Sequence, residues 1–368
     1  MRIWFAGGGT GGHLYPALGV ARALVALHPE VRPLFIGALR GIERDVLPAT
    51  GFEHALLQLH PLYRSRVWRN WRTVAGASRA WSALRALARS DPPAAVVATG
   101  GYAAGLALLY ATVHRIPIVL QEQNSVPGLT TRFFSRFARQ IHLGFPEAAK
   151  ALHPPRDAIV AASGNPIEPP PPIDEQALYG ARTRWGFTDP RARVLLVFGG
   201  SQGARAINSV ISELVRAGLP AGLCLLWITG KGEYEQYASL DGETTRVLPF
   251  LTPMTDAYAA ADLALARAGA MSTAELCAWG IPAVLVPLPT AAADHQTTNA
   301  RALEAAGAAV VITQRELTPH RLRETLDELL HDADRLGSMA AAARVRARPD
   351  AAARIARDVA ALIMPDGR

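Results

Sequence analysis

The sequence predicts an α/β protein built from two doubly wound domains, and three observations lead to this fold class. Short apolar runs alternate with longer segments whose apolar residues recur at helical spacing, which is typical of parallel sheets with crossover helices. Glycine-rich loops follow apolar runs in both halves of the chain. At 368 residues the chain is long enough to form two cores. We expect the two domains to face each other across a cleft.

The first glycine-rich loop, residues 6–13 (AGGGTGGH), lies between the apolar run 3–5 and the helix predicted over 15–24. Its backbone amides lie at a helix N-terminus, where an anion or a developing negative charge is favoured. The GxGxxG spacing that begins at Gly7 also fits a dinucleotide-binding loop, so the loop alone leaves an oxidoreductase open. His13 can act as a catalytic base or can bind the loop backbone.

The first half of the chain repeats this strand–loop–helix pattern. Residues 34–37 and 94–99 are predicted strands, and the second of them leads into another glycine-rich loop, 100–105 (GGYAAG). The predicted strand 116–120 ends in four polar residues, 121–124 (QEQN). Because ligands bind at the carboxyl ends of parallel strands, these loops are expected to form one side of a site.

A proline-rich stretch separates the two halves of the chain. A run of prolines cannot continue a helix or an inner strand, so it indicates a linker. The predicted boundaries are a first domain over 1–163, the linker over 164–174, a second domain over 175–345 and a last segment over 346–368.

The second half begins the same pattern again, with three predicted strands that each lead into a glycine-rich or polar segment. The pairs are strand 194–198 with loop 199–205 (GGSQGAR), strand 262–266 with segment 267–275 (RAGAMSTAE), and strand 283–286 with segment 294–300 (DHQTTNA). The second of these segments begins a helix and has an acidic residue about one turn in.

Charge is distributed unevenly along the chain, whose formal net charge is +7. Residues 1–165 contain 18 Lys or Arg against 8 Asp or Glu, whereas the remainder contains 20 against 23. The basic half is expected to face a lipid surface or a polyphosphate. Two cysteines far apart in apolar segments, Cys224 and Cys277, indicate a reducing compartment without a disulfide or zinc framework. We expect no signal peptide, and no apolar run reaches the ~18 residues of a membrane-spanning helix, so the chain is expected in the cytoplasm.

Residues 61–90 contain seven Arg and three Trp and no acidic residue. Aromatic and apolar residues at helical spacing with flanking cations are typical of a helix at a membrane interface. The alternative is a helix that packs its Trp side chains into the first domain and exposes its Arg. The residues expected to contact an anionic bilayer are Arg64, Arg66, Trp68, Arg69, Trp71, Arg72 and Trp81.

Seven motifs in a fixed order between residues 3 and 310 resemble a known family: GGGTGGH, GGYAAG, QEQNSVPGLT, SGNPI, GGSQGAR, ARAGAMSTAE and DHQTTNA. Together they are similar to the peptidoglycan N-acetylglucosaminyltransferases of glycosyltransferase family 28. The resemblance implies the GT-B architecture, with two Rossmann-like domains and a last helix, here 350–364, that returns to the first domain. It implies inverting transfer of N-acetylglucosamine from its UDP donor to the 4-hydroxyl of an undecaprenyl-diphosphate-linked N-acetylmuramoyl-peptide. No cofactor, bound metal or nucleic acid is expected, and the enzyme is expected to be peripheral on the cytoplasmic face of the membrane, serving cell-wall synthesis, cell shape and division.

The resemblance also assigns roles to individual residues. His13 matches the candidate base, with Glu122 as its competitor, as an orienting residue for the acceptor, or as an acid bonded to nearby amides. Glu275 matches the acid that binds the ribose hydroxyls, although an exposed helix-face carboxylate is the alternative. Leu251 matches the backbone position that reads uracil, and Gln296 matches the residue that holds the sugar hydroxyls. The other expected donor-side residues are Thr10, Gly11, Gly12, Asn124, Ser201, Arg267, Ala270, Met271, Ser272, Thr273 and Ala274, and the acceptor-side residues are Gly9, Gly101, Tyr102 and Asn124.

The residue chemistry fits this resemblance independently. No Asp-x-Asp pair stands at a predicted strand end, so loop amides, helix dipoles and Arg are expected to neutralise the leaving diphosphate. One position departs from the family, because Glu168 stands where Arg usually follows the GNPI motif, and no role is carried over to it. The remaining alternatives are another GT-B enzyme such as a galactolipid synthase, a UDP-sugar epimerase, the oxidoreductase above, and a nucleotide-sugar sensor without turnover.

Overall fold

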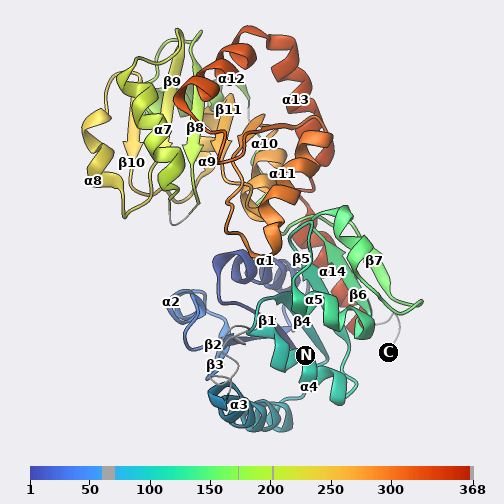
Figure 1. The fold of residues 1–368 in the computed structure, drawn as a ribbon. Helices are drawn as coiled ribbons and strands as arrows, with labels where there is room; N and C mark the ends of the chain where they lie inside the picture. The colour runs from blue at the N-terminus through green and yellow to red at the C-terminus, as the bar shows by residue number, and fades with distance from the viewer. Residues whose placement is uncertain (60–70, 173, 201–202, 365–368) are drawn as a thin grey trace. The chain divides into compact units, whose positions relative to one another are not determined.

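The computed structural model describes residues 1–59, 71–172, 174–200 and 203–364. The chain forms two compact units, one of Met1–Glu168 together with Arg348–Arg368 and one of Pro169–Ala347. In the part of the chain that is described, each unit contains one parallel β-sheet with helices packed on it (Figure 1).

The sheet of the first unit has the strand order β3-β2-β1-β4-β5-β6-β7 within the described residues, and all of its pairs are parallel. The strands are β1 Arg2–Gly7, β2 Arg32–Ala38, β3 Glu53–Leu57, β4 Ala95–Gly100, β5 Ile118–Glu122, β6 Gln140–Leu143 and β7 Ile159–Ala161. The strand order reverses between β1 and β4, and in doubly wound sheets ligands bind at this switch point. The first two glycine-rich loops directly follow these two strands.

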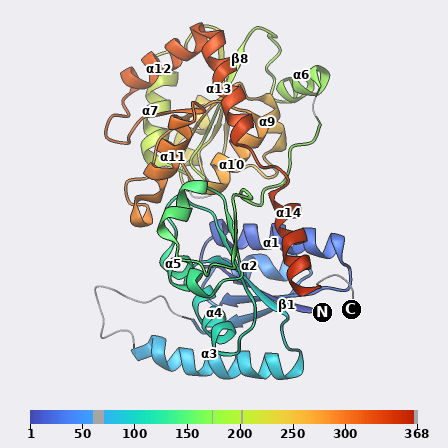
Figure 2. The same ribbon diagram turned by 90° about the vertical axis from the view of Figure 1, so that its right-hand side faces the viewer.

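Side chains of the first sheet alternate between two cores, as expected for a strand buried on both faces. In β1, Trp4 and Ala6 join the core under α3 and α4, whereas Ile3 and Phe5 join the core under α1 and α14. Helix α14 packs along α1, so the end of the described chain completes the first unit (Figure 2). The helices of this unit are α1 Gly11–Leu27, α2 Glu43–Val46, α3 Trp71–Ser90, α4 Ala104–Val113, α5 Leu129–Phe134 and α14 Ala351–Ile363.

The second unit repeats the topology with the strand order β10-β9-β8-β11-β12-β13 among its described residues. Its switch point lies between β8 and β11, so α7 and α10 begin beside each other at the same edge of the sheet. The strands are β8 Arg193–Phe198, β9 Leu223–Ile228, β10 Thr245–Leu248, β11 Leu263–Ala266, β12 Ala283–Leu285 and β13 Ala309–Val311. The helices are α6 Glu175–Arg184, α7 Arg205–Arg216, α8 Tyr234–Tyr237, α9 Thr255–Ala260, α10 Ala270–Trp279, α11 His295–Ala305, α12 Pro319–His331 and α13 Ala333–Arg346.

The predicted fold class, an α/β protein with two doubly wound domains, is confirmed. The Trp81 ring packs against Tyr110 at 5.2 Å and His114 at 6.3 Å between α3 and α4, as in the packing alternative, and its membrane contact stays a prediction. The expectations for Arg64, Arg66, Trp68 and Arg69 lie outside the described residues, as do the side chains of Trp71 and Arg72. Among the described helices, none combines the length and apolar character needed to cross a membrane.

Candidate active site

His13 lies in the first turn of α1, directly after the first glycine-rich loop. Its Nδ1 is 2.9 Å from the carbonyl oxygen of Thr99 and 2.9 Å from Oε1 of Gln123. Two hydrogen bonds orient the Gln123 amide, because its Nε2 donates to the same Thr99 oxygen at 2.9 Å and to the Gln121 carbonyl at 3.0 Å. Since both neighbours of Nδ1 are acceptors, Nδ1 carries the proton and Nε2 of the neutral ring has the lone pair. This tautomer can accept a proton at Nε2.

A buried acid holds the first glycine-rich loop in place. Glu43 is fully buried, and its Oε1 accepts hydrogen bonds from the amides of Gly9 at 3.0 Å and Ala38 at 3.2 Å. A Cβ on Gly8 would overlap this carboxylate, so the close approach of loop and acid requires glycine there. The sequence contains no motif that marks Glu43, and our sequence analysis missed it.

The two glycine-rich loops of the first unit pack against each other at the switch point. Gly9 has a φ of 89°, and a Cβ there would lie 2.8 Å from the ring of Tyr102. Gly101 has a φ of 78°, and a Cβ there would lie 2.3 Å from the carbonyl oxygen of Gly8 and 3.2 Å from the ring of His13. The expected acceptor-side residues Gly9, Gly101 and Tyr102 are therefore brought together around His13.

Glu122 binds the backbone of its own loop. The carboxylate is 3% exposed, and its two oxygens accept from the amides of Asn124 and Gly128, each at 3.1 Å. This is the amide-bonded alternative that the sequence left open, and it leaves His13 as the better candidate base. Asn165 of the SGNPI motif braces the same loop, since it accepts from Gln121 at 3.1 Å and donates to the Gln123 carbonyl at 3.0 Å.

In the second unit, α10 begins at the switch point with its first-turn amides directed out of the helix. Gly269, the residue before the helix, has no side chain with which to cap them. The buried Thr273 donates to the Gly269 carbonyl through its hydroxyl at 3.0 Å and through its backbone amide at 2.9 Å, so both of these donors are held within the helix. The N-terminus of a helix favours an anion. Glu275 lies further along the same helix and is half-buried, and its Oε2 accepts from the Tyr258 hydroxyl at 2.7 Å.

The Arg267 guanidinium is buried and bonded to neutral oxygens. It donates to the carbonyls of Val286 and Pro287, both at 3.1 Å, and to Oε1 of Gln314 at 2.7 Å. Burial lowers the pKa of this group. Gln296 binds the same segment, because its Oε1 accepts from the Leu288 amide at 3.0 Å. Arg267 and Gln296 therefore shape the chain that follows β12.

The other expected residues occupy loops at these two switch points or near them. Thr10 precedes α1 and accepts from the His13 and Leu14 amides at 3.2 Å, and Leu251 is half-buried between β10 and α9. Ser201 lies outside the described residues. Gln123 lies in the polar segment expected at the site, but its contact with His13 was not foreseen, and Tyr258, like Glu43, was missed because it acts through a partner in another element. In the described part of the chain, no three His, Cys, Asp or Glu side chains are grouped so that they could hold a metal ion.

Residues 3–143 match the glycosyltransferase family 28 N-terminal domain, and residues 194–355 match the glycosyltransferase family 28 C-terminal domain. The chain belongs to glycosyltransferase family 28.

Two bacterial relatives are similar over nearly the whole chain, and both have the name UDP-N-acetylglucosamine--N-acetylmuramyl-(pentapeptide) pyrophosphoryl-undecaprenol N-acetylglucosamine transferase. The protein of Moorella thermoacetica is 41% identical over 367 residues, which cover 95% of this chain and 96% of the relative. That of Salinibacter ruber is 43% identical over 371 residues, covering 98% and 96%. The crystal structure of Acinetobacter baumannii MurG superposes with a TM-score of 0.75 at 28% identity and covers 97% of this chain and 98% of its own.

Proposed function

We propose that this enzyme transfers N-acetylglucosamine from UDP-N-acetylglucosamine to the 4-hydroxyl of undecaprenyl-diphosphate-linked N-acetylmuramoyl-peptide, with inversion at the anomeric carbon. The names of the relatives support the two substrates. The observation that carries the reaction type is the tautomer of His13, whose protonated Nδ1 leaves Nε2 ready to accept a proton.

In this mechanism, Nε2 of His13 removes the proton of the acceptor hydroxyl as its oxygen attacks the anomeric carbon. The bond between that carbon and the diphosphate breaks, and UDP leaves with the electron pair. Negative charge develops on the leaving diphosphate in the transition state. Amide dipoles that are already oriented toward it stabilise this charge without having to reorganise.

We assign donor binding to the second unit. The start of α10, with the backbone amides of its first turn, faces the diphosphate, and the buried cation of Arg267 lies in the segment just before it. A buried cation bonded to neutral oxygens favours a nearby anion. Glu275 receives the ribose hydroxyls, the Leu251 backbone reads uracil and Gln296 holds sugar hydroxyls. We expect the transfer to need no bound metal or cofactor.

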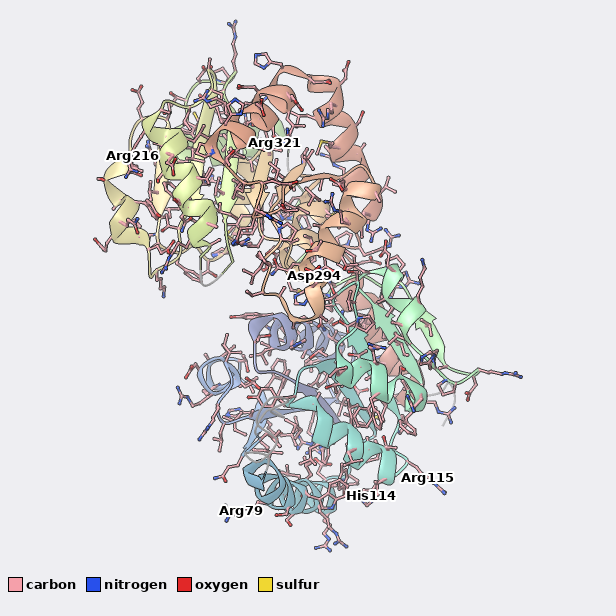
Figure 3. All side chains as sticks on the ribbon, in the orientation of Figure 1. Arg79, His114, Arg115, Arg216, Asp294 and Arg321 are labelled. Carbon is pink, nitrogen blue, oxygen red and sulfur yellow. The ribbon has the colours of Figure 1, made fainter. Side chains whose placement is uncertain are left out.

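We propose that the enzyme works as a peripheral protein on the cytoplasmic face of the membrane, where its lipid-linked acceptor is anchored. Two pairs of apolar residues spaced four apart are exposed on neighbouring helices, Leu109 with Val113 on α4 and Leu129 with Phe133 on α5. Exposed cations accompany them: Arg136 lies 5.3 Å from the centre of the Phe133 ring. The side-chain view also shows Arg115 extending outward beyond the end of α4 (Figure 3). An apolar surface beside arginines is typical of contact with an anionic bilayer.

A UDP-release assay tests the proposal most directly. UDP should be released from UDP-N-acetylglucosamine only when the lipid-linked muramoyl acceptor is present, and the product should have the β configuration. Binding of the donor with no release in the presence of acceptor would indicate a nucleotide-sugar sensor. Conversion of the donor without acceptor would indicate an epimerase or a hydrolase.

A further inference from the structure

Tyr258 reaches Glu275, the proposed ribose-binding acid, from a neighbouring helix. The tyrosine lies in α9, is 5% exposed, and donates its hydroxyl to Oε2 of Glu275 at 2.7 Å. Its ring lies against Phe198 at 6.2 Å, edge to face, and against Trp279 at 5.7 Å. Phe198 ends β8 just before the third glycine-rich loop, and Trp279 ends α10. The rings of Phe198 in β8 and Trp279 in α10 therefore hold the Tyr258 phenol toward Glu275.

Helix α9 is itself braced by α6 and the residues that follow it. Nε of Arg182 donates to the Ala260 carbonyl at 3.2 Å, and the Trp185 indole donates to the Asp256 carbonyl at 3.3 Å. These bonds tie both ends of α9 to α6 and to the residue that follows it. Tyr258 thus lies on a rigid support, which is what a residue needs in order to orient another one.

The hydrogen bond has a fixed direction. Burial and the neighbouring carboxylate of Glu275 raise the pKa of Tyr258 well above its usual value of 10, so the phenol keeps its proton and donates it. A carboxylate offers about four acceptor positions, so Glu275 can accept from Tyr258 and from two ligand hydroxyls together. The bond from Tyr258 holds one oxygen of this carboxylate in place.

We propose that Tyr258 is a positioning residue that presents Glu275 to the adjacent 2′- and 3′-hydroxyls of a ribose, and so makes the site selective for ribonucleotide donors. The inference rests on the donor-binding role of Glu275 in the proposed function. Without the tyrosine hydroxyl, the carboxylate keeps its place on α10 but loses a contact that orients it. Recognition of the ribose then weakens, while binding of uracil and diphosphate stays as it is.

Calorimetric binding of UDP and of 2′,3′-dideoxy-UDP to the full chain tests this inference. Wild type should prefer UDP, and Glu275→Ala should abolish the preference. Tyr258→Phe should weaken UDP binding about three- to tenfold, the effect of one hydrogen bond, and should leave dideoxy-UDP within about twofold. Tyr237→Phe is a matched control, because this tyrosine is equally buried in the same unit and packs on Trp227 at 4.9 Å. It should change neither affinity.

Two results would overturn the inference: unchanged UDP affinity in Tyr258→Phe, or an equal loss for both nucleotides, which would mean a general structural role. Melting temperatures of the variants show whether each one is folded. The double variant Tyr258→Phe/Glu275→Ala should bind UDP no more weakly than Glu275→Ala. If Glu275→Ala still prefers UDP, the ribose site of the proposed function is wrong and the inference fails with it. If only Tyr258→Phe gives the wrong result, the ribose site stands.

Discussion

Replacement of His13 tests the proton-transfer step of the proposed mechanism. His13→Ala removes the Nε2 lone pair that we assign to the base, and general base catalysis contributes about 10²–10⁴-fold to rate. We therefore expect kcat to fall by this factor, which corresponds to about 2.7–5.4 kcal/mol of transition-state stabilisation. Binding of UDP should remain close to that of wild type, because the assigned uracil and ribose contacts come from other residues.

The structure also gives the cost of this change to stability. His13 is half-buried, and its removal deprives the Thr99 carbonyl and Gln123 Oε1 of one donor, although Gln123 Nε2 still donates to Thr99. One lost hydrogen bond lowers the free energy of unfolding by about 1–2 kcal/mol, well within the ~5–15 kcal/mol of a folded protein. The Ala variant should fold, so its loss of activity reports on catalysis.

His13→Asn is a sharper control. The Asn side-chain amide can donate to the acceptors that now receive Nδ1–H, but it cannot serve as a base. We expect this variant to recover stability relative to His13→Ala and to remain equally slow in UDP release at saturating substrates. Glu122→Gln should instead lower mainly the melting temperature, because it places an amide NH₂ against one of two backbone donors. A His13→Asn enzyme within fivefold of wild type, together with a fully folded but inactive Glu122→Gln enzyme, would assign the base to Glu122.

Two further predictions concern acid stability and membrane binding. Burial lowers the pKa of His142 from 6.5 to about 4, so the unfolded chain takes up a proton at higher pH than the folded one. The free energy of unfolding should therefore fall by about 3 kcal/mol as the pH drops from 6.5 to 4. Denaturant titrations of His142→Gln should lack this part of the pH dependence. Parallel pH profiles for the wild type and the variant would contradict the prediction. The wild-type protein should co-sediment with anionic vesicles and be released by salt, whereas Leu129→Ser/Phe133→Ser should stay in solution. Leu178→Ser, an exposed apolar residue of the second unit, is the matched control, and vesicle binding by the double variant at the wild-type level would exclude this docking surface.

The sequence by itself determined the fold class and predicted which loops form the site. Apolar runs followed by glycine-rich loops are local patterns, and the carboxyl ends of parallel strands always meet at one edge of a sheet. The loops after Gly7 and Gly100 could therefore be expected to meet, and the structure places Gly101 directly against Gly8. The motif series then added the reaction, because the residue types at those strand ends match one family.

Only the tertiary structure decided what each polar side chain does. Glu122 could as well have faced a substrate, and the structure instead places its carboxylate on the amides of Asn124 and Gly128. The partners that orient His13 lie 86 and 110 residues away, and Glu43 reaches the first loop across 34 residues. Such partners come from helices and strands that are far apart in the sequence and meet only when the chain folds. The direction of a side chain depends on which helix and strand lie beside it, so local sequence does not predict these contacts.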